Sequence, residues 1–575
     1  MPDHTAALRL DDVRIRYDGS ADDTPNGVSF DVRTGDVVLI LGPSGCGKST
    51  LALSLNGLVP HAVAATLSGS VFVNGIRTAD ATVSRLSQDV AMVFQDPDSQ
   101  LVTGTVFDEV CFGPENLLLP VDAVLERAER ALRAVGLWER RLDNPDVLSG
   151  GGKQRLAIAC ALAMDTGVLV LDEPTANLDP TGIADVYAVL RDIAAAGTHA
   201  VVLVEHNLDA AIDLVDRVIV LDGTGRIAFQ GDPRTVLAGA ADQVAALGVW
   251  LPVATLAALR LRSAGVVLDP LPLTPDELTA ALNGIRSLPP LPECTPEPTV
   301  VPSDAAVSVR GLTVTRGRTP IIRDVSLEIA RGDFVTVIGA NGAGKTTLVQ
   351  ALAGVVPPPK GRVRVGDLDP ATSDARMLAD HIGFVFQNPE HQFIENTVFD
   401  ELAHGLRVRG HAGDGLSVDE IEARVTAMLE RFGLERHRDM HPFLLSGGQK
   451  RRLSVGTALI TGAPVLVLDE PTFGQDRQRA NELLTLLRDL HRSGTTVITV
   501  THDLQLVAEY ASHVAVMHDG QLLAFGAAGD ILGDDELLSS AGLILPPLAR
   551  AMRGVTRHPS WMSLTRVSDL PGSPT

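Results

Sequence analysis

Two glycine-rich segments of this chain end in a lysine followed by hydroxyl residues, a pattern suited to holding phosphate groups. They are GPSGCGKST (Gly42–Thr50) and GANGAGKTT (Gly339–Thr347). Glycines let backbone N–H groups converge on phosphate oxygens, and the start of a following helix adds positive potential. Lys48 and Lys345 are therefore expected to reach the β- and γ-phosphates of a nucleotide. The predicted phosphate-binding residues are Gly42, Pro43, Ser44, Gly45, Cys46, Gly47, Lys48, Ser49 and Thr50, and Gly339, Ala340, Asn341, Gly342, Ala343, Gly344, Lys345, Thr346 and Thr347.

The segment VLVLDEPT occurs twice and places an acidic pair at the end of an apolar run, as Asp172 with Glu173 and as Asp469 with Glu470. The first acid of each pair suits the Mg²⁺ shell of a bound nucleotide, and the second can orient and polarise an attacking water. A lone acidic pair can also cap a helix. The predicted Mg²⁺ ligands from these segments are Ser49, Asp172, Thr346 and Asp469.

A third β-branched run in each half ends in a histidine, His206 in VVLVEHN and His502 in VITVTHD. A lone histidine at the end of a strand is usually structural or merely exposed. Because this one returns at nearly the same separation as the other motifs, we interpret both histidines as γ-phosphate contacts.

The chain is a tandem duplication, and its motifs keep a constant separation. The recurring positions are Lys48 and Lys345, Ser149 and Ser446, and Glu173 and Glu470. Register held across several motifs is the mark of a duplicated domain.

The strands that position these residues are predicted from the apolar runs that precede each motif. Asp36–Leu41 is a short apolar run typical of a buried parallel strand, and it leads directly into the first glycine-rich segment. Each half is therefore predicted to be an α/β domain with a mixed or mostly parallel sheet and a helical subdomain. The predicted domains are 6–240, an appended helical segment 241–286, a proline-rich acidic linker 287–304, a second domain 305–535, and a short appendage 536–575. Composition does not decide whether the tail of this appendage is ordered or disordered.

Composition narrows the class of protein. The 575 residues carry a net charge of −23, which disfavours a broad nucleic-acid surface. The four cysteines have no pairing or metal-site spacing, as is typical of a reducing cytosol. No apolar run reaches the length of a spanning helix. We expect a cytosolic protein unless a partner holds it at a membrane.

The element LSGG stands at Leu148–Gly151 and again at Leu445–Gly448. With the other motifs it makes the chain resemble the ATP-binding cassette (ABC) family, because other phosphate-loop ATPases lack it. The resemblance covers most of the chain. It implies two P-loop NTPase domains packed head to tail, ATP and Mg²⁺ as cofactors, and ATP hydrolysis coupled to transmembrane transport.

In this family each composite site joins one cassette's phosphate loop to the other cassette's signature, so Lys48 would meet Ser446 and Lys345 would meet Ser149. The resemblance also places Tyr17 on the adenine and makes two glutamines the Q-loop residues that sense Mg²⁺. The implied catalytic residues are Glu173, Glu470, His206, His502, Gln95 and Gln387, the last two also being metal ligands. The implied signature contacts are Ser149, Gly150, Gly151, Ser446, Gly447, Gly448 and Gln449.

A narrower resemblance surrounds those glutamines. FQDPDSQLVTGTVFDEV (Phe94–Val110) and FQNPEHQFIENTVFDEL (Phe386–Leu402) look like the ATPases of energy-coupling factor (ECF) transporters. Such importers pair two cassettes with a transmembrane coupling subunit and a small substrate-binding membrane subunit, at the cytoplasmic face of the cell membrane. The resemblance implies docking of the coupling subunit near Asp96–Gln100 and Asn388–Gln392.

Some positions depart from the family pattern. The first signature has Gly152 where the family usually has glutamine, and the second half offers Arg316 where the first has Tyr17. Both departures fall on the composite site of Lys345, so we hypothesise that this site binds or turns over ATP less well; the alternative is that both changes are tolerated. The second half's FGQD (Phe473–Asp476) also departs from the first half's ANLD.

Other functions remain open at this point. A soluble twin-cassette ATPase acting on ribosomes is disfavoured by the acidic, proline-rich linker. The fused ATPase of a binding-protein-dependent sugar importer lacks the Q-loop neighbourhood seen here, and a purely structural protein does not need two sets of nucleotide groups. The ECF resemblance implies a vitamin, a vitamin precursor, or cobalt or nickel as cargo. A thiamine precursor is our guess among them.

Overall fold

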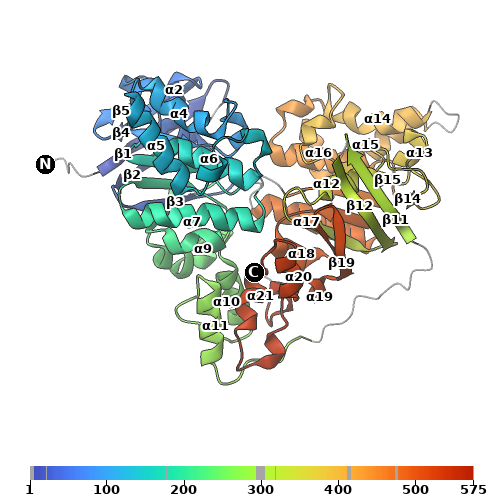
Figure 1. Cartoon of the computed structure of the whole chain (residues 1–575). Coiled ribbons are helices and arrows are strands. Elements are labelled where there is room, and N and C mark those ends of the chain that lie inside the picture. The colour runs from blue at the N-terminus through green and yellow to red at the C-terminus, as the bar shows by residue number, and fades with distance from the viewer. Residues whose placement is uncertain are drawn as a thin grey trace.

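The computed structural model describes residues 6–20, 22–176, 178–206, 208–292, 305–317, 319–410, 416–472 and 477–573. The predicted linker from residue 293 onward and the FGQD segment (Phe473–Asp476) lie outside the described residues. Two lobes stand side by side, with the appended helices of both halves gathered below them (Figure 1).

The first lobe is built on a six-stranded sheet in the order β10-β9-β3-β8-β7-β6. Its strands are parallel except for β10, which runs antiparallel to β9. Strands β3, β7 and β8 are buried along their whole length, which explains why they read as continuous apolar runs. A second, antiparallel sheet has the order β2-β1-β4-β5. The strands are β1 (Ala6–Tyr17), β2 (Asn26–Arg33), β3 (Val37–Leu41), β4 (Ala65–Val73), β5 (Ile76–Arg77), β6 (Val90–Val93), β7 (Val168–Asp172), β8 (Ala200–Val204), β9 (Arg217–Leu221) and β10 (Ile227–Gly231).

The second lobe repeats this plan, with a six-stranded sheet β15-β16-β17-β13-β18-β19 and an antiparallel sheet β12-β11-β14. Matched strand for strand, the two large sheets have the same order, so the duplication seen in the motifs extends to the topology. The strands are β11 (Ala305–Arg316), β12 (Thr319–Ala330), β13 (Phe334–Ile338), β14 (Val363–Val365), β15 (Ile382–Val385), β16 (Val465–Asp469), β17 (Thr496–Val500), β18 (His513–His518) and β19 (Gln521–Ala527).

Three helices in each lobe pack together as a helical subdomain, α4 to α6 in the first and α14 to α16 in the second. The predicted α/β architecture is thus confirmed. The first-half helices are α1 (Lys48–Leu55), α2 (Leu58–His61), α3 (Val83–Leu86), α4 (Val106–Asn116), α5 (Val121–Ala134), α6 (Gly150–Ala163), α7 (Pro180–Ala196), α8 (Leu208–Ala211), α9 (Ala241–Ala246), α10 (Val253–Ser263) and α11 (Pro275–Gly284). The second-half helices are α12 (Lys345–Leu352), α13 (Ala375–Ala379), α14 (Val398–Gly410), α15 (Val418–Phe432), α16 (Gly447–Leu459), α17 (Arg477–Arg492), α18 (Leu504–Tyr510), α19 (Ala528–Leu532), α20 (Asp535–Ser540) and α21 (Pro547–Arg553).

The two appended segments form one shared core. Helices α10 and α11, drawn in green, lie against α21, drawn in red (Figure 1). Their buried side chains belong to a single apolar cluster that also takes in Trp561, Leu564 and Leu570 near the C-terminus. The chain is therefore packed against this shared core as far as Leu570. Among the described residues, no helix has the length and apolarity needed to cross a membrane.

Candidate active sites

The first glycine-rich segment forms a loop between β3 and α1. Gly47 has φ of 96°, a left-handed conformation that favours glycine, and α1 begins at the next residue. Lys48 is 6% exposed, and its Nζ donates to the carbonyl oxygens of Gly42 (2.8 Å) and Pro43 (3.2 Å). The loop is thus wrapped around its own lysine at a helix N-terminus, where backbone N–H groups are free to meet an anion.

The second loop has the same geometry. Gly344 has φ of 94°, and Nζ of Lys345 donates to the carbonyls of Gly339 (2.8 Å) and Ala340 (3.0 Å). Burial lowers the pKa of Lys345, and the negative charges of Glu470, Asp179 and Asp469 partly offset this effect.

The first acid of each acidic pair ends a fully buried strand. Burial raises the pKa of Asp172 to about 6, although a hydrogen bond from Ser49 acts against this. Burial likewise raises the pKa of Asp469 to about 6, and Thr346 Oγ1 donates to its Oδ1 at 3.2 Å. No described residue donates to the buried Oδ1 of Asp172. A buried carboxylate oxygen without a partner beside a hydroxyl is the hard oxygen donor set that suits Mg²⁺.

The second acid of the first lobe is held from two sides. His206 Nε2 lies 3.0 Å from Oε1 of Glu173, and Gln95 Nε2 donates to Oε2 at 2.8 Å. Burial acts to raise the pKa of Glu173, but the hydrogen bond and charge of His206 outweigh it, so the pKa is lowered. Glu173 also has φ of 48°, which turns the backbone sharply at the strand end.

The second lobe keeps the carboxylate and histidine but not the glutamine contact. His502 Nδ1 lies 3.0 Å from Oε2 of Glu470, and the charge and hydrogen bond of that carboxylate raise the pKa of His502 against the opposing effect of burial. The Gln387 side chain is exposed, and among the described residues it makes no hydrogen bond to Glu470 like the one that joins Gln95 to Glu173. The two carboxylates, Glu173 and Glu470, are therefore held by different contacts.

The two signature serines cap the helices that follow them. Ser149 accepts from the N–H of Gly152 at 3.2 Å, and Ser446 accepts from the N–H of Gln449 at 3.5 Å. In the second lobe Gln449 Oε1 also accepts from the Ser446 N–H (2.9 Å), which completes a capping box. Gly152 has no side chain for this second bond, so the first signature helix starts with one cap bond fewer.

The two lobes meet near their nucleotide motifs. Asp179, at the start of α7 in the first lobe, accepts through Oδ2 from the backbone N–H of Asn341 in the second phosphate loop, at 2.8 Å. Glu173, His206, Thr472 and His502 together line one cavity of about 690 Å³ between the lobes. The hydrogen bonds described for Ser149 and Ser446 run to their own helices, at Gly152 and Gln449.

Two peripheral positions differ as the sequence suggests. The Tyr17 hydroxyl lies 3.1 Å from Thr50 Oγ1, which places an aromatic ring beside the first phosphate loop. Arg316 is exposed at the end of β11.

Sequence reasoning missed one pair of residues on the signature helices, Gln154 in the first lobe and Arg451 in the second. Both are buried, and the arginine contacts the Q-loop backbone. The sequence did offer a signal: the two residues occupy the same position after LSGG, and one is an uncharged amide whereas the other is a cation.

Two phosphate loops, two acidic pairs and two strand-end histidines on duplicated α/β lobes define a phosphate-loop ATPase built twice in one chain. The model of the ABC transporter family matches residues 25–176 and 322–473. The chain belongs to that family: it is an ABC ATPase, the ATP-binding and ATP-hydrolysing component of a transporter.

Relatives of this chain match it along nearly its whole length. "Putative HMP/thiamine import ATP-binding protein YkoD" of Bacillus subtilis is 35% identical, over 94% of this chain and 95% of the relative. "Putative ABC transporter ATP-binding protein" of Methanosarcina mazei is 37% identical, over 96% of this chain and 94% of the relative. Among solved structures, cbiO1 of Clostridium perfringens, described as part of the ABC transporter complex cbiONQ, is 31% identical with a TM-score of 0.37, over 41% of this chain and 94% of that one.

Proposed function

We propose that this chain is the ATP-hydrolysing energy-coupling subunit of an ECF-type importer at the cytoplasmic face of the cell membrane. The observation that carries the proposal is the pairing of a buried carboxylate with a histidine in both lobes, Glu173 with His206 and Glu470 with His502, each at 3.0 Å. Two complete sites of this kind, fused in one chain with no helix able to cross a membrane among its described residues, suit a motor that drives a separate membrane subunit.

Each residue then has a role in hydrolysis. Lys48 and Lys345 leave their loop carbonyls to bind the β- and γ-phosphates, and Glu173 and Glu470 orient the attacking water for in-line displacement. Asp172 with Ser49 and Asp469 with Thr346 would hold Mg²⁺, which would neutralise negative charge on the phosphates. Gln95, Gln387 and the signature residues complete the two composite sites, and binding of two ATP molecules closes the lobes.

The surfaces next to the Q-loops are built for a partner. In the first lobe the buried Glu109 accepts from the N–H groups of Val102 (3.0 Å) and Thr103 (2.6 Å), so it fixes the loop that follows the Q-loop. Val102 is left 68% exposed. An apolar side chain held outward on a fixed loop suits burial against a helix of the coupling subunit.

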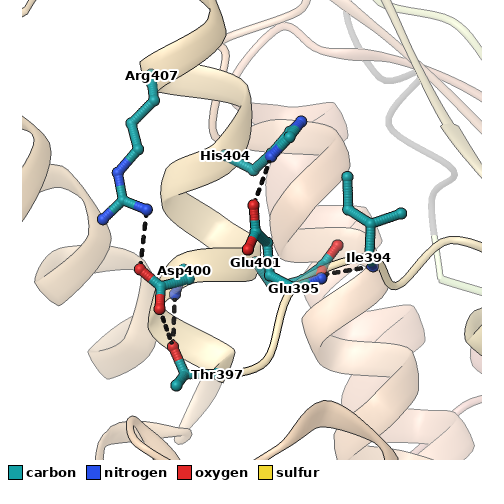
Figure 2. A network of polar contacts seen from close by, with 7 residues as sticks. All are labelled: Ile394, Glu395, Thr397, Asp400, Glu401, His404 and Arg407. Carbon is teal, nitrogen blue, oxygen red and sulfur yellow. Dashed lines mark hydrogen bonds and ion pairs between the residues drawn. The ribbon is translucent and has the colours of Figure 1, made fainter.

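In the second lobe a buried glutamate fixes the corresponding loop in the same way, and more charged side chains surround it. Glu401 accepts from the N–H groups of Ile394 (2.9 Å) and Glu395 (2.8 Å), and Ile394 is 67% exposed. Glu395 pairs with His404 at 2.8 Å, as Figure 2 shows along one face of α14. In the first lobe the position of His404 is taken by Phe112, so the two docking surfaces differ in polarity.

A salt bridge ties each docking turn to its signature helix. Lys153 pairs with Asp98 in the first lobe, and Lys450 pairs with Glu390 at 2.6 Å in the second. A displacement of the turns at Asp96–Gln100 and Asn388–Gln392 by the coupling subunit would therefore be passed to the helices that begin at the signatures.

The cargo that we propose is a vitamin or vitamin precursor, supported by the relative whose name specifies HMP/thiamine import. Affinity purification of the chain from its native membranes, with identification of co-purifying proteins and small molecules, tests the whole proposal. We expect two membrane proteins and a pyrimidine or thiazole compound. Val102→Glu and Ile394→Glu should each reduce recovery of the membrane proteins, whereas Val267→Glu, an exposed site on the appendage, should not. Recovery of ribosomes in place of membrane proteins would contradict the proposal.

A further inference from the structure

The side chain of Arg451 is almost fully buried on the signature helix α16 of the second lobe, at 3% exposure. Its Nη1 donates to the carbonyl of Phe386 at 2.6 Å, and its Nη2 donates to the carbonyls of Gln387 (2.5 Å) and Glu470 (3.4 Å). One guanidinium therefore joins three parts of the catalytic apparatus: the signature helix, the Q-loop backbone and the turn that carries the catalytic carboxylate.

The electrostatics agree with this geometry. Burial lowers the pKa of Arg451 to about 10, while the charges of Asp469 and Glu470 raise it. The same cation lowers the pKa of Asp469 in return. A planar guanidinium that donates several charge-assisted bonds fixes its acceptors in both distance and orientation.

Among the described residues, the first lobe has no equivalent link. Gln154 occupies the matching place on α6 and is 1% exposed, yet neither its Nε2 nor its Oε1 has a hydrogen-bond partner among the described residues. Its catalytic carboxylate is held instead by the Q-loop side chain, since Gln95 donates to Glu173 at 2.8 Å. The two lobes therefore use different groups for the same task.

We propose that Arg451 is a positioning residue that sets the Q-loop and Glu470 from the signature helix in the second lobe alone. The Gln387 side chain is itself exposed, so without Arg451 the turn that carries Glu470 loses its bond to the signature helix and the carboxylate is no longer aimed at the attacking water. The inference rests on the proposed catalytic role of Glu470.

The position of α16 gives the link a direction. This helix begins beside Ser446, which the proposed composite arrangement places at the nucleotide of the Lys48 site. Arg451 carries a movement of that helix to the carboxylate of the Lys345 site. The reverse route runs along α6, where Gln154 makes no such bonds. Occupancy of the Lys48 site thus prepares the other site for hydrolysis more strongly than the reverse.

Arg451→Gln gives the second lobe the residue of the first and tests the proposal in the full chain. Binding is measured by photolabelling with 8-azido-ATP and Mg²⁺ in the cold, and turnover by vanadate-dependent trapping of the labelled diphosphate at working temperature. Proteolysis and mass spectrometry then assign the label to the first or second cassette. Arg452→Gln, at the neighbouring half-exposed arginine, is the matched control.

We expect Arg451→Gln to lower trapping in the second cassette about tenfold, with labelling in the cold within twofold of wild type. Arg451→Lys should recover part of the loss because it keeps the charge and one donor. Equal losses in both cassettes, a loss of cold labelling, or no change would overturn the proposal. Wild-type trapping confined to the first cassette would also refute it, whereas absence of trapping in both would count against the catalytic roles proposed for Glu173 and Glu470.

Discussion

At the residue scale, Asp209 shows how burial sets the charge of a carboxyl group that has no proposed role in hydrolysis. Burial raises the pKa of Asp209 to about 7, and its Oδ1 accepts from the N–H of Val253 at 3.0 Å. The unfolded chain releases this proton near pH 4. Because the folded state holds the proton more tightly, this group lowers stability as pH rises from about 4 to 7.

Asp209→Asn keeps an acceptor for Val253 and removes the buried charge. We expect it to raise the free energy of unfolding by about 1 kcal/mol at pH 8, and by progressively less as the pH falls toward 4. Urea unfolding at pH 8 and pH 5 measures the difference. Asp18→Asn, at an exposed loop position, is the control for losing one negative charge. A gain that does not depend on pH would contradict the assignment.

The two carboxylates proposed as catalytic give a second prediction at this scale. The carboxylate of Glu173 is held by both Gln95 and His206, whereas among the described residues the carboxylate of Glu470 is held by His502 and Arg451 reaches only its backbone carbonyl. We expect Glu173→Gln to lower kcat by about 100-fold or more, since general-base groups contribute on the order of 10²–10⁴. We expect Glu470→Gln to lower kcat by less than about tenfold, because its less firmly held carboxylate contributes less to total turnover. Steady-state ATPase rates decide this, and equal losses would show that the sites turn over alike.

At the scale of elements, the sequence predicted those parts of the site that depend on local pattern. A buried strand leading into glycines, then a helix starting at Lys48, follows from an apolar run and a glycine at a left-handed position. The bond from Gln95 to Glu173 and the bonds of Arg451 do not follow, because they join segments far apart in the chain. Periodicity shows that a residue is buried but not what it touches.

The shared core of the appendages was beyond sequence reasoning for the same reason. Composition indicated two separate helical segments, yet α10 and α11 pack against α21. Leu548 on α21 is fully buried in this cluster. We expect Leu548→Ala to lower the free energy of unfolding by about 2–5 kcal/mol, the usual cost of a large-to-small change in a core.

Thermal and urea unfolding measure that loss. Leu118→Ala, at a position 90% exposed, should stay within about 0.5 kcal/mol of wild type. A loss at Leu548 as small as that at Leu118 would mean that the appendages are not packed as one core.

At the scale of the whole molecule, the two halves are joined by more than the peptide chain. Arg260 Nε in α10 donates to the carbonyl of Leu570 at 2.7 Å, and Thr279 Oγ1 in α11 donates to the carbonyl of Ala551 at 2.7 Å. These bonds surround the apolar cluster that both halves share, so the appendages form a joint between the lobes. This joint holds the halves together through side chains that lie outside the two phosphate loops.

Cutting the chain between the halves tests this joint. With a specific protease site inserted in residues 293–304, we expect the two cleaved fragments to elute together in size-exclusion chromatography, at the mass of the intact 60.7 kDa chain. The shared core provides the reason, because separating the fragments would expose apolar side chains from both. The same cut in the Leu548→Ala variant should release a fraction of free fragments, since the cavity weakens the joint. Cleaved wild-type fragments that elute apart would show that the linker, and not the appended core, keeps the two ATPase lobes paired.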